Sequence, residues 1–252
     1  MTYTNRMLLF GDSHTNAMLR AAERRVKRGE YVPLLIHRLR KKKKDKIIGD
    51  TSLEEFLDKI CNLGNSDIVL SMIGGNQHAV FSTIQNPAKF DFFEPSRPDW
   101  IADHDAQIIP YSAIRDYFVD SINRGDGRSI RALRDSTSAH VVHVLPPPPK
   151  RDAAHILARH ESRFAEDGIA QLGVSAPELR MKCWTLQTDV LTEFCGAIGV
   201  GVMAPPSEAC DADGFLLREY YANDATHANP SYGELILQSL EKGVLTLGGD
   251  GA

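Results

Sequence analysis

Hydrophobic residues occur along the chain in short continuous runs, separated by longer stretches in which apolar and polar residues alternate with helical spacing. A short apolar run that ends at glycine or proline is typical of a strand buried on both faces of a parallel sheet. Five such runs are predicted to be strands: residues 6–10, 31–36, 67–73, 139–145 and 199–204.

The stretches between these runs have helical composition and helix-start signals. Ser52 and Glu55 have the spacing of a capping box, and Asn229 is placed to cap the last helix. Helices are predicted at residues 15–28, 52–61, 111–123, 130–135, 152–167, 177–196 and 230–240. Strands that alternate with helices predict a parallel sheet covered on both faces.

One stretch does not fit this alternation. Residues 77–110 are too long for an ordinary connection and are predicted to be a long insertion loop within one domain of residues 1–252. Its aromatic residues either pin the insertion onto the domain or form a lid or wall of a substrate pocket. They are Phe81, Phe90, Phe92, Phe93 and Trp100.

Composition narrows the class of protein. Lys and Arg total 29 against 33 Asp and Glu, so the net charge is −4 and there is no basic excess to indicate a nucleic-acid partner. The four cysteines are widely spaced, which argues against a disulfide scaffold or a structural zinc site. The first apolar run is too short for a signal peptide or a membrane span, so we expect a cytoplasmic protein with reduced thiols. Nothing in the sequence indicates an oligomeric state.

Three polar segments lie where the predicted strands end or the last helix begins. Ser13 ends a Gly-Asp-Ser segment after the first strand, Asn76 ends a Gly-Gly-Asn segment after the third, and an Asp-x-x-His segment joins Asp224 to His227. In open parallel sheets, ligands bind beyond the carboxyl ends of the strands where the strand order reverses. In the order 2-1-3-4-5 that point lies between the first and third strands, which deliver Ser13 and Asn76.

These residue types match the chemistry of acyl transfer. A serine hydroxyl becomes a useful nucleophile beside a base such as His227, and Asp224 can orient that base and stabilise its charged form. An oxyanion needs fixed donors, which the backbone N–H of Ser13 and the side-chain amide of Asn76 can supply. Each segment also has a structural interpretation: Ser13 as an N-cap, Gly-Gly-Asn as a turn, and Asp-x-x-His as helix capping.

Together the three segments resemble the SGNH hydrolases, the GDSL esterase/lipase family. The family's Gly-Asp-Ser, Gly-x-Asn and Asp-x-x-His blocks match the segments that end at Ser13, Asn76 and His227. The resemblance covers residues 7 to about 240. It implies a three-layer α/β/α fold, with a flavodoxin-like five-stranded parallel sheet, and a Ser13-His227-Asp224 triad.

The sequence departs from the family pattern in two places and is weakly marked in a third. His14 stands where leucine or isoleucine usually follows the serine, and Gln77 stands where aspartate often follows the asparagine. The glycine whose N–H completes the oxyanion hole is assigned to Gly49 by its order in the chain, in preference to Gly64.

The sequence predicts a serine esterase that acts on a small-molecule or glycan ester and needs no metal or organic cofactor. An O-acyltransferase with the same triad and a non-catalytic binding module on the same fold are the alternatives. The lysine-rich run at residues 38–46 is interpreted as a solvated loop, with a local anion site as its functional alternative.

Overall fold

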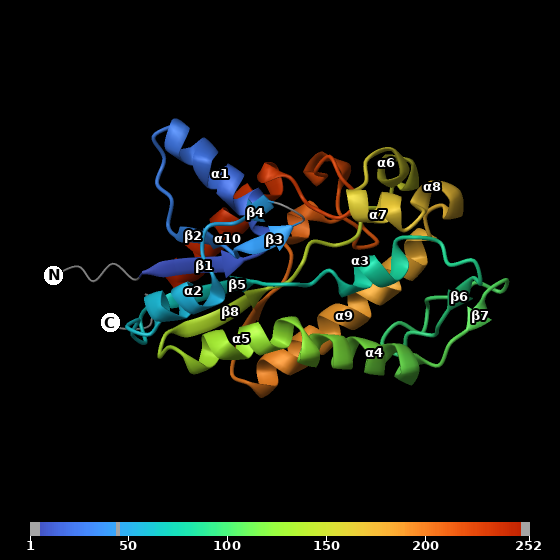
Figure 1. The fold of residues 1–252 in the computed structure, drawn as a ribbon, viewed down its shortest axis with the longest axis horizontal. Helices are drawn as coiled ribbons and strands as arrows, with labels where there is room; N and C mark the ends of the chain where they lie inside the picture. The colour runs from blue at the N-terminus through green and yellow to red at the C-terminus, as the bar shows by residue number, and fades with distance from the viewer. Residues whose placement is uncertain (1–5, 44–45, 248–252) are drawn as a thin grey trace.

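The computed structural model describes residues 6–43 and 46–247. Its centre is an all-parallel five-stranded sheet in the order β2-β1-β5-β8-β9 (Figure 1). Counted along the chain, this is the predicted order 2-1-3-4-5. The strands are β1 (Met7–Gly11), β2 (Leu35–Arg38), β5 (Ile68–Met72), β8 (His140–Val144) and β9 (Gly201–Met203).

The two central strands are apolar because both of their faces are covered. Every residue of β1 and β5 is buried, and the strands pair in parallel with Leu9 opposite Leu70. Gly11, at the end of β1, lies so close to β5 that an added Cβ would come within 2.4 Å of the Met72 carbonyl oxygen. Only glycine therefore lets the chain leave β1 at this point without displacing β5.

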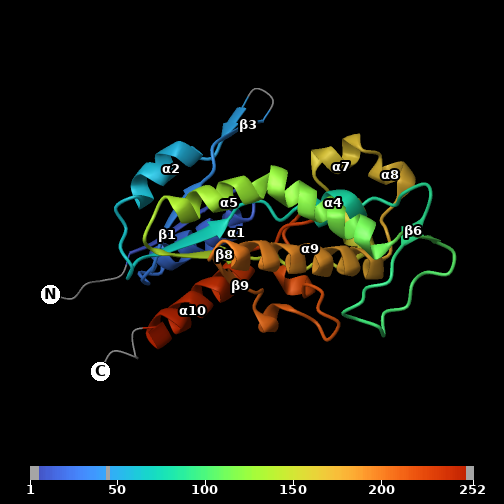
Figure 2. The same cartoon turned by 90° about the horizontal axis from the view of Figure 1, so that it is seen from below.

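Alternate residues of β1 contribute to two separate cores, as the period of a strand requires. Leu8 and Phe10 belong to the core formed with helices α2, α4, α5 and α9, whereas Leu9 belongs to the core formed with α1 and α10. Figure 2 shows α10 on one side of the sheet and α2 and α5 on the other. This arrangement confirms the three layers. The helices are α1 (Thr15–Lys27), α2 (Leu53–Ile60), α4 (Tyr111–Arg124), α5 (Asp126–Asp135), α9 (Pro177–Ala197) and α10 (Pro230–Leu247).

Two predicted helix starts are confirmed. Ser52 and Glu55 form both hydrogen bonds of the capping box at the start of α2. The side chain of Asn229 accepts from the backbone of Ser231 and Tyr232 in the first turn of α10. The shorter elements are α3 (Gln77–Ser82), α6 (Ala153–Ala158), α7 (Ser162–Glu166), α8 (Ile169–Leu172) and the 3-10 helices η1 (Ser207–Ala209) and η2 (Arg218–Tyr220).

Residues 77–110 differ from the predicted loop. They begin with α3 and contain a small parallel pair, β6 (Phe90–Asp91) and β7 (Gln107–Ile108). The buried Lys182 of α9 anchors this insertion, because its Nζ lies 2.9 Å from both carboxylate oxygens of Asp91 and donates to the carbonyls of Phe92 and Ile101. Phe92 is fully buried in the core, in agreement with the interpretation that aromatic residues pin the insertion.

Two further expectations were wrong in detail. The lysine-rich run is a hairpin of β3 (Lys41–Lys43) and β4 (Lys46–Ile48), not a loop; Lys44 and Asp45 lie outside the described residues. The segment at 152–167 is two helices, α6 and α7, because the chain leaves the helical conformation at Arg159. All four cysteines are free, and no helix within the described residues is long and apolar enough to span a membrane.

Candidate active site

The structure brings the Ser13 and Asn76 segments together at the carboxyl ends of β1 and β5. The backbone N–H of Asp12 donates to the Met72 carbonyl, and its carboxylate accepts from the backbone N–H of Gly74 at 3.1 Å. His14 lies on the other side of Ser13 in the chain, and its Nε2 lies 2.7 Å from Oδ1 of Asn76. Ser13 is thus flanked by two residues that bind the segment carrying Asn76.

The turn that presents Asn76 depends on two glycines. Gly74 and Gly75 have φ of 73° and 85°, a left-handed conformation that side chains with a Cβ rarely adopt. At Gly74 an added Cβ would also overlap the carboxylate of Asp126. The Gly-Gly-Asn segment is therefore a turn, as its structural interpretation predicted, and the turn positions Asn76 at the edge of the sheet.

Ser13 does not serve as a helix cap. The N-cap of α1 is His14, and it makes no side-chain capping hydrogen bond. The Ser13 hydroxyl, which is half-buried, forms no hydrogen bond with any residue that the structure describes. This removes the usual structural reason for a serine at this position.

The Asp-x-x-His segment folds into a compact acid–base pair. Nδ1 of His227 lies 2.9 Å from Oδ2 of Asp224, and Oδ1 of the same carboxylate accepts from the backbone N–H groups of His227 and Thr226. On the opposite side of the ring, His227 Nε2 is buried and has no hydrogen-bond partner among the described residues. The imidazole is therefore oriented by Asp224 and leaves Nε2 available for a proton transfer.

His14 connects the two halves of the site. Its ring centroid lies 4.9 Å from that of His227, while its Nε2 contacts Asn76. No hydrogen bond joins Ser13 to His227 in the described structure. Catalytic hydrogen bonds are often long in unliganded enzymes and tighten when substrate binds.

The surroundings of His14 and His227 shift the pKa values of these two side chains in opposite directions. Burial, together with the charge of His227, lowers the pKa of His14 to about 4. Burial also opposes the charge on His227, but its contacts with Asp224 and Glu161 raise its pKa to about 9. In the same way, hydrogen bonds with His227 outweigh burial and hold the pKa of Asp224 well below its usual range. His14 is therefore neutral at pH 7, and its Nε2 hydrogen is donated to Asn76.

The three donors predicted for the oxyanion hole have no acceptor among the described residues: they are the backbone N–H groups of Ser13 and Gly49 and the side-chain amide nitrogen of Asn76. Gly49 follows β4 at the carboxyl end of β2, where an added Cβ would come within 2.2 Å of the Leu39 carbonyl oxygen. Leu39 itself donates to the carbonyl of Gly11, the first residue of the segment that ends at Ser13. The position of Gly49 is compatible with the role predicted for it, which stays a prediction.

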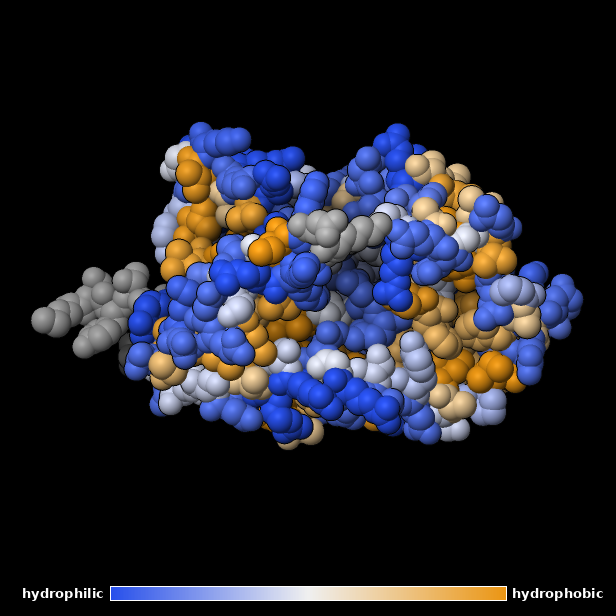
Figure 3. Space-filling view, in the orientation of Figure 1, coloured by the Kyte–Doolittle hydropathy of each residue, from blue (hydrophilic) through white to orange (hydrophobic). Residues whose placement is uncertain are grey.

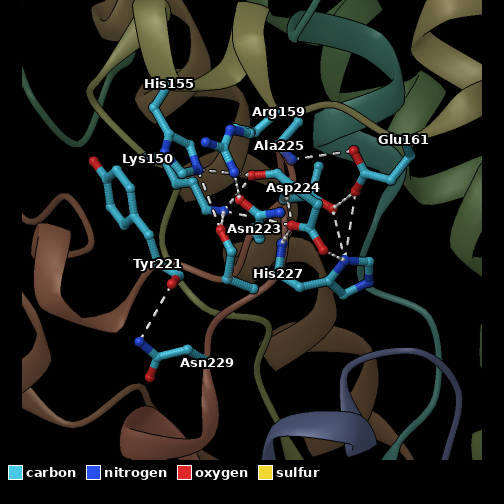
Figure 4. A network of polar contacts seen from close by, with 12 residues as sticks. Lys150, His155, Arg159, Glu161, Tyr221, Asn223, Asp224, Ala225, His227 and Asn229 are labelled. Atoms are coloured by element: carbon cyan, nitrogen blue, oxygen red, sulfur yellow. Dashed lines mark hydrogen bonds and ion pairs between the residues drawn. The ribbon is translucent and has the colours of Figure 1, made fainter.

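Two residues near the pair were missed from the sequence. Lys150 is buried, and its Nζ donates to the carbonyls of Ala222 and Asp224 and lies 3.4 Å from the Asp224 carboxylate (Figure 4). Glu161 lies 3.4 Å from Nδ1 of His227. Neither has a local sequence signal, because both come from segments remote in the chain from the Asp-x-x-His motif.

The lysine hairpin lies beside the nucleophile segment. Lys41 Nζ is 3.3 Å from Oδ2 of Asp12, although Lys41 is itself exposed. Figure 3 shows mainly hydrophilic side chains over the face of the molecule on which this hairpin lies. The hairpin thus brings positive charge to the neighbourhood of Ser13.

A cavity and two groups of possible metal ligands lie away from the site or share residues with it. A cavity of about 360 Å³, lined by Trp100, Met181 and Phe215 among others, contains none of the predicted site residues. Among the residues that the structure describes, two groups of side chains have the spacing to hold a metal ion. They are the loop residues Asp103, His104 and Asp105, and the set Glu161, Asp224 and His227 within the site.

Comparison with known proteins found solved structures that align with most of this chain at low sequence identity. No family model and no curated protein matches the sequence. A GDSL-like lipase from Bacteroides thetaiotaomicron is 12% identical, with 98% of this chain and 91% of that chain aligned and a TM-score of 0.49. A carbohydrate acetylesterase from Sinorhizobium meliloti is 12% identical over 96% and 99% of the two chains, with a TM-score of 0.47. A phospholipase A1 from Streptomyces albidoflavus is 13% identical over 94% and 98%, with a TM-score of 0.44.

The activities named belong to those proteins. What this site can do is argued from its own contacts.

Proposed function

We propose that the protein is a serine esterase in which Ser13 is the nucleophile, His227 the general base and Asp224 the residue that orients it. The observation that carries the proposal is the His227 ring. Its Nδ1 is bound by Asp224, its Nε2 has no described partner, and it packs against His14, the neighbour of Ser13. A base held in this way, in contact with the residue that follows a serine with no capping role, fits the requirements of nucleophilic catalysis.

In the proposed acylation step, Ser13 Oγ attacks the ester carbonyl while neutral His227 accepts the hydroxyl proton at Nε2. The oxyanion that forms is stabilised by donors that have no other acceptor among the described residues, namely Ser13 N–H, the Asn76 amide and Gly49 N–H. When the C–O bond breaks, His227 returns the proton to the leaving alcohol. An acyl-Ser13 ester remains.

In the proposed deacylation step, a water molecule gives a proton to His227 and attacks the acyl carbonyl. The second tetrahedral intermediate releases the acid and regenerates the Ser13 hydroxyl. These steps balance without a metal or an organic cofactor. We propose a small-molecule or glycan ester as the substrate class.

An O-acyltransferase would share the acylation step and use a sugar hydroxyl in place of water. A non-catalytic binding module would have no chemical need for an oriented, partnerless Nε2 beside His14. We therefore place hydrolysis first, with acyl transfer to a second hydroxyl as the alternative for the same residues.

A panel of p-nitrophenyl esters of increasing acyl length, assayed with the wild type and Ser13→Ala, tests the proposal. We expect turnover of at least one ester by the wild type, and a loss on the order of a million-fold in the variant. A sugar acceptor added to the same assay separates the two reactions, since a transferase would yield acylated sugar in place of free acid. Equal rates for wild type and a folded Ser13→Ala variant would exclude the proposed nucleophile.

A further inference from the structure

A second carboxylate faces the same nitrogen of His227 as Asp224. Nδ1 lies 2.9 Å from Oδ2 of Asp224 and 3.4 Å from Oε1 of Glu161, and the two carboxylates reach the ring from different segments (Figure 4). The side chains of His227 and Glu161 are only 20% and 24% exposed. A triad of serine, histidine and one aspartate does not require this second acid.

The orientation of Glu161 is specific. It occupies the N-cap of α7, a position where a carboxylate usually accepts from its own helix, yet it makes no side-chain capping bond. Its oxygens accept instead from the hydroxyl of Thr226 at 2.6 Å and from the backbone N–H of Ala225 at 3.2 Å. Both donors belong to the turn between Asp224 and His227. The carboxylate is thus held toward His227 and away from its own helix.

We propose that Glu161 is a second acidic positioning residue for His227, which shares with Asp224 the tasks of orienting the ring and stabilising its protonated form. This inference rests on the proposed function, since it concerns the base of that reaction. Two carboxylates on one ring nitrogen favour the imidazolium more than one does, so the neutral base forms only at higher pH. They also make Asp224 partly replaceable, because Glu161 can still contact Nδ1 when Asp224 is changed.

Neither of the two other titratable groups beside the ring supplies negative charge. Lys150 lies 3.4 Å from the Asp224 carboxylate, and its positive charge opposes protonation of His227. The ring of His14 packs against that of His227, and His14 is neutral at pH 7 because burial lowers its pKa to about 4. The acid pair formed by Asp224 and Glu161 is therefore the source of stabilisation for the charged ring.

The experiment measures the titration of His227 in wild type and Glu161→Gln by ¹⁵N NMR of the imidazole nitrogens, assigned with His227→Ala, alongside the pH profile of kcat/KM. Glutamine keeps an oxygen for Thr226 and removes the charge, and it replaces the second oxygen, which accepts from Ala225 N–H, with an amide nitrogen. We expect both the NMR midpoint and the rising limb of the profile to move to lower pH by about one unit. Asp167→Asn, at the other end of α7, where the carboxylate pairs with Arg163 at 3.6 Å, is the matched control for loss of one negative charge and should leave both unchanged.

A double variant tests the shared role. If Glu161 supports the ring, Glu161→Gln combined with Asp224→Asn should reduce kcat by more than the product of the two single reductions, because no carboxylate is left on Nδ1. The inference is overturned if Glu161→Gln moves neither the NMR midpoint nor the pH limb and lowers only the melting temperature. That result would make Glu161 a support for the Asp224–His227 turn alone. The proposed function fails independently, through hydrolysis that survives Ser13→Ala, and the NMR titration can be read in either case.

Discussion

Nε2 of His14 donates to Oδ1 of Asn76 across 2.7 Å, which ties the residue after the proposed nucleophile to the proposed oxyanion donor. The bond occupies the amide oxygen and leaves the amide nitrogen of Asn76 free to face the substrate. The pKa of His14 is lowered to about 4 by burial and by the charge of His227, so His14 is neutral in the neutral range and carries its one ring hydrogen on Nε2, which faces the Asn76 oxygen. The histidine that departs from the family pattern thus has a structural role.

Replacing His14 with leucine, the residue usual in the family, should lower kcat about tenfold with little change in KM. The loss corresponds to about 1.4 kcal/mol, which is within the range for one hydrogen bond that orients a transition-state donor. Steady-state kinetics on the best p-nitrophenyl ester measure it. An unchanged kcat would mean that Asn76 is held without His14.

Asn76→Ala should lower turnover by about a hundred- to a thousand-fold, the usual scale for one oxyanion donor. The Michaelis constant should change much less, since the amide acts on charge that develops in the transition state. If KM rises while kcat stays the same, Asn76 binds the substrate ground state and is not an oxyanion donor.

The wild-type activity should rise with pH. His227 must be neutral to accept a proton, and its pKa is raised to about 9 by Asp224 and Glu161 against the effect of burial. kcat/KM should therefore increase about tenfold per pH unit between pH 7 and 8 and level off above pH 9. Ser13→Ala supplies the blank for base hydrolysis of the ester. A profile that is flat from pH 7 to 9 would contradict a charged resting state of His227.

The lysine hairpin predicts a preference for anionic substrates. Lys41 reaches Asp12 beside Ser13, whereas Lys42 pairs with Ile47 and points to the other face of the hairpin. Lys41→Ser should raise KM for p-nitrophenyl hemisuccinate by up to about fivefold, the scale of an exposed ion pair, and leave p-nitrophenyl acetate unaffected.

Lys42→Ser is the matched control, and added salt should reproduce the effect of Lys41→Ser because exposed charges are screened within about 8–10 Å. Equal KM values for the two serine variants would mean that the hairpin only solubilises this face.

The sequence predicted the features that depend on local signals. The buried strand β5 is a continuous apolar run, the capping box at Ser52 has a fixed spacing, and the Asp224–His227 pair needs only one turn of chain. The sheet order 2-1-3-4-5 was predicted from the resemblance to the SGNH hydrolases, and the observed order agrees with it.

The features that the sequence did not predict depend on contacts between residues far apart in the chain or on exposure to solvent. The β3–β4 hairpin has no hydrophobic alternation, because β3 consists of three lysines and all residues of β4 are exposed. Glu161 lies 64 residues before Ala225, with which it hydrogen-bonds, so no spacing rule connects it to His227. The same holds for Lys182, whose ion pair with Asp91 spans 91 residues and anchors the insertion.

The central claim is that Ser13 carries the acyl group. Rapid acid quenching during turnover of a p-nitrophenyl ester, followed by peptide mass spectrometry, tests it directly, with Asp224→Asn used to slow deacylation if needed. The account predicts a mass increase equal to the acyl group on the peptide that contains Ser13, and no such adduct in Ser13→Ala. Hydrolysis accompanied by an acyl adduct on another residue, or by the same adduct in Ser13→Ala, would contradict it.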